Sequence, residues 1–246
     1  MVFTDTHVHL ADEALFCRLP EVLARARAAG VCRFVAPSAQ RCDWPLIEGM
    51  AGGGVVPALG LHPWFAGQDG DLDGLDAFLG RNPRAWVGEI GLDYRRAPSP
   101  AERAAQRDLC AKQLDLARQY GRPVILHCVA ASADLALLLK RSAVPGGIVH
   151  AFSGSLEEAG VWMRLGFKIG MGSLLLNPNA KKARAAAALL PLDALVLETD
   201  SPFMLKGGIN MPENVRRVAE EVCALRGMGL DALAAATEAN TDALLV

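Results

Sequence analysis

The sequence predicts an α/β protein that folds as a single (β/α)8 barrel, and three observations support this. The chain has 246 residues, 52% of them hydrophobic, which is enough for one large core. A short apolar run followed by an alanine- and leucine-rich stretch recurs eight times along the chain. Each short run is almost entirely apolar, as is typical of parallel strands covered on both faces.

Eight strands are expected in chain order, with helical composition between them. They cover Val2 to His7, Cys32 to Ala36, Val55 to Leu61, Ala85 to Ile90, Val124 to His127, Gly147 to His150, Phe167 to Gly170, and Leu195 to Glu198. Eight such units match a barrel of about 250 residues in number and order. A doubly wound open sheet is the structural alternative, because the rhythm does not show closure. We expect one domain over residues 1–246.

The clearest helix is predicted over Pro100 to Tyr120. Its apolar side chains, including Leu109 and Leu114, fall roughly along one face, while the charged side chains stay largely off that face. Gly121 then supplies a stop signal. The alanine run at 185–188 is also predicted to be helical.

Composition argues for a soluble cytoplasmic protein. No basic and apolar leader opens the chain, and no apolar run approaches membrane-spanning length. The formal net charge of -2 provides no global attraction to nucleic acid, so any phosphate binding must be local. The six cysteines are dispersed without a C-x-x-C pair, which favours reduced thiols and argues against a cysteine-based zinc site.

All five histidines lie at or just past the end of a predicted strand. His7 and His9 follow the first strand two residues apart, and because side chains alternate along a strand, they can point the same way. Taken alone, this pair is as consistent with two structural histidines as with two metal ligands.

Ionisable residues at the ends of other apolar strands favour the interpretation of His7 and His9 as metal ligands. In a closed barrel, these strand ends meet at one mouth, where burying such groups without a metal or a partner costs several kcal/mol each. Four imidazoles and two carboxylates form a ligand set for two divalent ions, with one carboxylate placed to bridge them. The predicted ligands of this dinuclear site are His7, His9, Glu89, His127, His150 and Asp200.

Seven segments, spread in order along the chain, resemble the successive motifs of the TatD family of metal-dependent hydrolases. They are Asp5 to Leu10, Gly60 to Pro63, Val87 to Tyr94, Pro123 to His127, His150 to Ser155, Leu197 to Pro202, and Asn210 to Glu213. The resemblance implies a barrel hydrolase of the amidohydrolase type, often a deoxyribonuclease that acts as a 3′ to 5′ exonuclease. DNA is then the expected partner, and no association with a membrane is expected. The protein is expected to be a monomer or a weak oligomer.

The resemblance also implies a role for each ligand. His7, His9, Glu89 and Asp200 would surround one ion, and Glu89, His127 and His150 the second. Glu89 would bridge two ions of zinc, manganese or magnesium. Asp200 would also be the general base that takes a proton from the attacking water, although an aspartate before Ser201-Pro202 could instead cap a helix. Glu198 is expected to support the site without binding metal.

Three residues are candidates for substrate binding. His62 could contact the scissile phosphate or be a buried structural histidine. Arg95 follows Glu89 in a stretch, beginning at Asp93, that is expected to be a loop above the barrel mouth; it could clamp a phosphate or carry an ordinary solvated charge. Ser153 could present its backbone amide to an anion, while the nearby Ser155 could simply cap the next helix.

The chain departs from the TatD pattern after His127, where Cys128-Val129 stands in place of a small residue and an arginine. This weakens the expectation for phosphate more than that for metal. Two alternatives therefore remain: the same site hydrolysing an ester or amide, such as an aminoacyl-tRNA linkage, or a non-catalytic binding subunit. The C-terminal tail also lacks the family's closing aromatic, which we interpret as a packing variation. None of the six lysines ends a predicted strand, which argues against relatives that bridge their metals with a modified lysine.

Overall fold

Eight parallel strands form one sheet in simple chain order in this computed structural model, which describes residues 1–67 and 71–245. The strands are β1 (Phe3–Asp5), β2 (Val31–Pro37), β3 (Val55–Leu59), β4 (Trp86–Asp93), β5 (Val124–Val129), β6 (Gly147–Val149), β7 (Phe167–Met171) and β8 (Leu195–Leu197). Each predicted strand overlaps the observed one. Strands β6 and β8 are three residues long, and each ends one residue before the predicted end, at His150 and Glu198.

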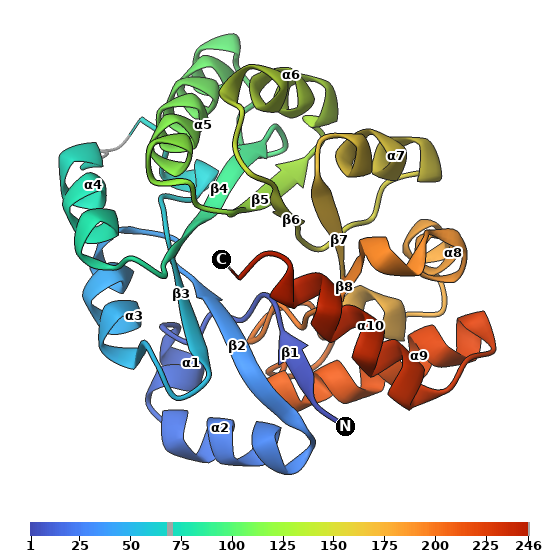
Figure 1. Cartoon of the computed structure of the whole chain (residues 1–246). Helices are drawn as coiled ribbons and strands as arrows, with labels where there is room; N and C mark the ends of the chain where they lie inside the picture. The colour runs from blue at the N-terminus through green and yellow to red at the C-terminus, as the bar shows by residue number, and fades with distance from the viewer. Residues whose placement is uncertain (68–70, 246) are drawn as a thin grey trace.

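Helices surround the strands as an outer ring (Figure 1). They are α1 (Glu13–Phe16), α2 (Leu19–Ala28), α3 (Trp44–Met50), α4 (Leu72–Arg81), α5 (Pro100–Tyr120), α6 (Ser132–Ser142), α7 (Leu156–Arg164), α8 (Lys181–Leu189), α9 (Val215–Arg226) and α10 (Leu230–Asp242). Short 3-10 turns lie at η1 (Arg41–Asp43), η2 (Pro63–Phe65), η3 (Ser173–Leu176), η4 (Leu192–Ala194) and η5 (Pro212–Asn214).

The sheet closes between its first and last strands. The backbone N–H of Thr6 donates to the carbonyl of Leu197 at 2.9 Å, and that of Asp200 donates to the carbonyl of His7 at 2.9 Å. An open sheet would leave β1 and β8 as unpaired edges. These bonds confirm the barrel and rule out the doubly wound alternative.

Helix α5 has the predicted bounds because its ends carry strong local signals. Ser99 accepts a hydrogen bond from the backbone N–H of Glu102, whose side chain in turn accepts from Ser99, and Pro100 occupies the first helical position. At the other end, Gly121 adopts the left-handed conformation, with φ of 63°, that a residue with a side chain rarely takes. The predicted alanine run lies inside α8.

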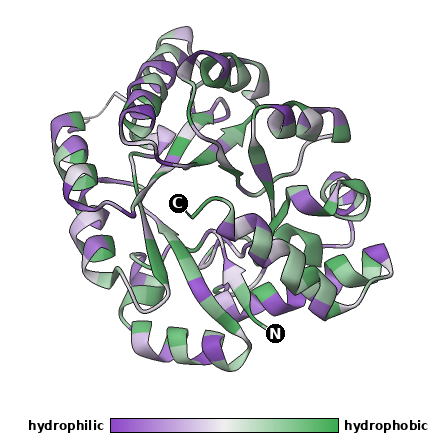
Figure 2. Cartoon of the chain, viewed as in Figure 1, coloured by the Kyte–Doolittle hydropathy of each residue, from purple (hydrophilic) through white to green (hydrophobic). Residues whose placement is uncertain are grey.

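Side chains fill the barrel interior. An inner layer of buried residues comes from six strands and is closed by Leu244 of the C-terminal tail, which is only 8% exposed: Val35, Ala58, Trp86, Ile125, Ile148 and Val196. Figure 2 shows hydrophobic colouring along the strands and mixed colouring on the surrounding helices.

The helices and the cysteines bear on two expectations drawn from composition. Among the described residues, no helix combines the length and apolarity needed to cross a membrane. All six cysteines are free thiols, and Cys110, the only one classed as buried, packs in the core.

Candidate metal centre

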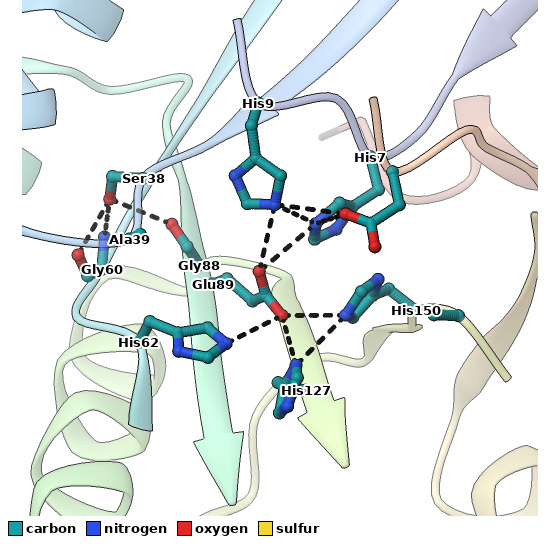
Figure 3. A network of polar contacts seen from close by, with 12 residues as sticks. His7, His9, Ser38, Ala39, Gly60, His62, Gly88, Glu89, His127 and His150 are labelled. Carbon is teal, nitrogen blue, oxygen red and sulfur yellow. Dashed lines mark hydrogen bonds and ion pairs between the residues drawn. The ribbon is translucent and has the colours of Figure 1, made fainter. Parts of the chain in front are cut away.

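The carboxyl ends of the strands carry the predicted ligands to one place in the barrel mouth. His7 and His9 follow β1, Glu89 lies within β4, and His127 lies within β5. His150 directly follows β6, and Asp200 lies three residues after β8. Figure 3 shows five labelled imidazoles converging on Glu89 from different elements. The structure therefore brings all six predicted ligand residues together.

An irregularity in the sheet aims Glu89 into the mouth. The pairing between β4 and β5 shifts register between Val87 and Ile90, and such bulges redirect side chains. The backbone N–H of Glu89 donates to the carbonyl of Ser38, just after β2, at 2.9 Å, and not to a neighbouring strand. Ser38 is itself fixed by a hydrogen bond from its hydroxyl to the carbonyl of Gly60 at 2.8 Å.

The two carboxylate oxygens of Glu89 face two separate groups of side chains. Oε2 lies 3.3 Å from Nε2 of His7 and 3.6 Å from Nε2 of His9. Oε1 lies 2.8 Å from Nδ1 of His127 and 2.8 Å from Nε2 of His150. Glu89 is 2% exposed. This arrangement is the geometry expected of a carboxylate that bridges two ions.

Asp200 completes the group around Oε2. Its Oδ1 lies 3.5 Å from Nε2 of His7 and 3.3 Å from Nε2 of His9. Asp200 does not cap a helix, since the next helical turn begins at Pro212. The capping alternative is therefore wrong, and the carboxylate is directed into the cluster.

His62 belongs to the group around Oε1. Its Nε2 lies 3.5 Å from Oε1 of Glu89, and the residue is 5% exposed. His62 also supports its own loop, because its Nδ1 accepts a hydrogen bond from the backbone N–H of Trp64 at 3.2 Å. His62 is thus buried and supports its loop, as one interpretation predicted, and it faces Glu89; its contact with a phosphate stays a prediction.

The cluster combines carboxylates of lowered pKa with imidazoles of both kinds: burial lowers the pKa of His7 and His62, whereas neighbouring carboxylates outweigh burial and raise the pKa of His9, His127 and His150. Burial disfavours the charged form of Glu89, but the imidazoles around it, His150 first, outweigh burial and hold its pKa well below the ordinary range. For His150, burial lowers the pKa, but Glu89 and Glu198 outweigh it and raise the pKa well above the ordinary value. The pKa of Asp200 is lowered in the same way, against its burial, by a hydrogen bond from His9.

The donor set fits divalent metal ions. Ring nitrogens face each other in pairs, with Nε2 of His7 3.1 Å from Nε2 of His9 and Nδ1 of His127 3.4 Å from Nε2 of His150. Two uncharged nitrogens gain nothing from such proximity unless a proton or a cation lies between them. Three overlapping groups of three side chains each place one ligand atom per residue within 4.8 Å of the others in that group. The groups are His7, His150 and Asp200; His7, His9 and Glu89; and His62, Glu89 and His127. Imidazole and carboxylate together suit zinc, manganese and iron.

Supporting carboxylates lie behind the cluster. Glu198 is fully buried; its Oε1 accepts a hydrogen bond from the backbone N–H of Ala151 at 2.5 Å and lies 3.7 Å from Nδ1 of His150. Asp5 accepts from the backbone N–H and the hydroxyl of Thr199, at 2.9 and 2.6 Å. Burial raises the pKa of Asp5 well above its ordinary value. Both acids brace strand ends from behind, as expected for Glu198.

Asp93 lies beside the cluster and in strand β4, where the sequence predicted a loop. Strand β4 continues to Asp93, which is 4% exposed. Its Oδ2 lies 3.2 Å from Nε2 of His127 and accepts a hydrogen bond from Nε1 of Trp64 at 2.7 Å. The position of Asp93 was not predictable from spacing alone, because the register of β4 against β5 shifts at Glu89.

Arg95 and Ser153 lie outside the cluster. Both are exposed, and neither is among the residues that line the mouth. Their contact with substrate stays a prediction. Ser155 caps helix α7 through a reciprocal pair of hydrogen bonds with Glu158, which accounts for Ser155 without an anion.

The cluster opens into a cavity of about 540 Å³. Its floor includes His62, Glu89 and Asp200, and its rim includes the rings of Trp64 and Phe203. A second hollow of about 660 Å³ lies where strands β3 to β5 begin, beside Leu244 and Leu245. Of these two cavities, the first is lined by candidate ligands and the second is not.

Comparison with known proteins identifies relatives over almost the whole chain. The family model described as "TatD related DNase" matches residues 4–246. A protein named uncharacterized metal-dependent hydrolase YjjV, from Escherichia coli K12, is 38% identical, covering 98% of this chain and 97% of its own. A protein named 3′-5′ ssDNA/RNA exonuclease TatD, from Cronobacter sakazakii, is 32% identical, covering 92% and 91%. The crystal structure of the YjjV TatD homologue superimposes with a TM-score of 0.91 at 36% identity, covering 99% and 97%.

Proposed function

Because this chain belongs to the family of TatD-related DNases and is a metal-dependent hydrolase, we propose that it cleaves phosphodiester bonds at the 3′ end of a nucleic acid strand, with DNA as the expected substrate. The observation that carries the proposal is the division of the Glu89 oxygens between two groups of donors. A pair of divalent ions supplies a nucleophile at neutral pH and neutralises charge on a phosphate oxygen.

The proposed ligands follow the two groups. His7, His9 and Asp200 would hold one ion with Oε2 of Glu89, and His127 and His150 the other with Oε1. Zinc, manganese and magnesium are the candidate metals.

Asp200 is the proposed general base. Its lowered pKa keeps it a carboxylate at neutral pH, so it can accept a proton from the attacking water. It lines the cavity from which substrate approaches, and its backbone N–H is fixed by a hydrogen bond to the carbonyl of His7. His62, on the other side of Glu89, is the candidate for steadying the scissile phosphate.

The test is a hydrolysis panel with the metal content measured in parallel. Single-stranded, 3′-recessed and 3′-overhanging oligonucleotides are incubated with Mg²⁺, Mn²⁺ or Zn²⁺, and we expect stepwise shortening from the 3′ end. A metal-loaded protein that shortens none of them would overturn the nuclease proposal.

An acyl-ester arm belongs in the same panel, because Val129 replaces the arginine that TatD-type proteins often carry after this strand's histidine. Release of amino acid from an aminoacyl-tRNA, without DNA cleavage, would assign the same site to ester hydrolysis.

A further inference from the structure

One tryptophan at the cavity rim is exposed where the other three are buried. Trp44, Trp86 and Trp162 are 0 to 2% exposed, whereas Trp64 is 50% exposed. A large aromatic ring left in water gives up the stabilisation that burial would bring. Such exposure beside a catalytic cavity points to a ligand that covers the ring.

Trp64 is held firmly despite its exposure. Its Nε1 donates to Oδ2 of Asp93 at 2.7 Å, and its backbone N–H donates to Nδ1 of His62 at 3.2 Å. The indole meets the ring of His62 edge-on, with centroids 4.8 Å apart. Because these contacts fix the ring, a ligand that stacks on it pays little for ordering the side chain.

A second exposed ring flanks the other half of the ligand cluster. Phe203 is 50% exposed and meets the ring of His9 edge-on, with centroids 5.5 Å apart. Its backbone N–H donates to the carbonyl of Asp200 at 2.8 Å. Trp64 therefore lies beside the donors around Oε1 of Glu89, and Phe203 beside those around Oε2; both line the same cavity.

Charge at the mouth is asymmetric. The guanidinium of Arg96, which does not itself line the cavity, lies 4.6 Å from the centroid of the Trp64 ring at the rim. Three acids line the cavity: Asp12 and Glu13 at the start of α1, and Asp43 at the end of η1. Phosphates are attracted toward Arg96 and repelled from these three acids.

We propose that Trp64 and Phe203 are the stacking platforms of a subsite for unpaired bases at the end of a nucleic acid strand, with Trp64 for the base whose phosphate runs past Arg96. This inference rests on the proposed function and narrows it to ends that are single-stranded or frayed. Aromatic side chains stack on any base that is free of its own neighbours. A base inside a duplex is already stacked and paired, so its faces cannot reach the ring.

Indole fluorescence tests the subsite without turnover. Among the four tryptophans only Trp64 is solvent-exposed, so a base stacked on it should quench that emission. We titrate the chelator-treated protein with oligothymidylate of about eight nucleotides, within the range bound by single-strand sites. Saturable quenching is expected, and it should be absent from Trp64→Phe and from an oligomer whose terminal residues are abasic.

Steady-state kinetics provide a second and independent readout. Trp64→Leu should raise KM for the single-stranded oligonucleotide roughly 5- to 100-fold, the usual range for loss of one stacked base. Trp64→Phe, which keeps a ring, should restore most of the affinity. On a substrate with an abasic 3′ end, Trp64→Leu and wild type should have the same KM.

Arg96→Ala should weaken binding and reduce the slope of log affinity against log salt concentration by roughly 0.7, the value for one phosphate contact on a single strand. Matched controls come from helix α6, away from the mouth: Arg141→Ala for the charge and Leu137→Ala, 48% exposed, for the apolar surface. Both should behave as wild type.

Failure of the subsite and failure of the proposed function give different results. Suppose that wild type shortens DNA but that the KM of Trp64→Leu is unchanged, or rises by the same factor on abasic as on intact 3′ ends. The subsite is then refuted and the nuclease function stands. If wild type cleaves no phosphodiester at all, the proposed function fails, and the quenching titration decides separately whether Trp64 binds a base.

Discussion

Oδ2 of Asp93 lies 3.2 Å from Nε2 of His127, the ring nitrogen that points away from Glu89. The same oxygen accepts the indole N–H of Trp64. One carboxylate thus orients a candidate metal ligand and an exposed ring at the rim. Although burial opposes it, hydrogen bonds from His127 and Trp64 lower the pKa of Asp93 to about 2, so it is ionised at any pH where the enzyme would act.

Asp93→Asn should reduce metal affinity or turnover about 10- to 100-fold, the usual effect of losing a carboxylate behind a histidine ligand. The amide keeps the shape but places no full negative charge beside His127. Metal titration and kcat measure the effect. Asp115→Asn, at an exposed site on α5, is the control, and equal behaviour of the two variants would refute the positioning role.

Glu89→Gln should abolish hydrolysis and lower the metal content measured by elemental analysis. The amide nitrogen cannot bind a cation, so one of the two groups of ligands loses the Glu89 oxygen that faces it. Glu220→Gln, in an exposed ion pair with Arg216, should leave both quantities unchanged. Wild-type turnover by Glu89→Gln would remove the bridging role.

Metal binding should release protons and weaken as the pH falls. Although burial acts against it, neighbouring carboxylates raise the pKa of His9, His127 and His150, so these rings hold protons that a metal must displace. Affinity should therefore decrease from about pH 8 to about pH 6, around the ordinary histidine pKa. Calorimetric titration in two buffers of different protonation enthalpy counts the protons; identical heats in both would contradict this.

Gly170→Ala should impair the site without touching a candidate ligand. A Cβ at Gly170 would lie 2.3 Å from Oε2 of Glu198, and Glu198 could not then stay beside Ala151 and His150. We expect a loss of about 1–3 kcal/mol in the free energy of unfolding from overpacking, with reduced turnover.

Gly49→Ala is the matched control for that substitution. No atom lies within 4 Å of a Cβ built there, in helix α3. The free energy of unfolding should rise by roughly 0.5–1 kcal/mol, with unchanged turnover. Thermal melts and initial rates compare the two variants, and wild-type turnover by Gly170→Ala would show that Glu198 has no influence on the site.

Sequence patterns predicted the fold well because buried parallel strands are nearly all apolar and stand out as short runs. The six candidate ligands were predictable because each follows or ends such a run. The extent of β4 was not, since the register shift at Glu89 depends on pairing with β5. The role of Asp93 was missed for the same reason, and the exposure of Trp64 depends on contacts between loops that no local pattern encodes.

The hydrogen bonds that close the barrel join segments from the two ends of the chain. Asp5 and Thr199 are 194 positions apart, so half of the candidate site depends on contacts between the two ends of the chain, and such distant contacts slow folding. A nascent or truncated chain that lacks β8 therefore has neither a closed barrel nor Asp200. Such a chain cannot assemble the reactive half of the centre, so hydrolysis can begin only once the barrel has closed.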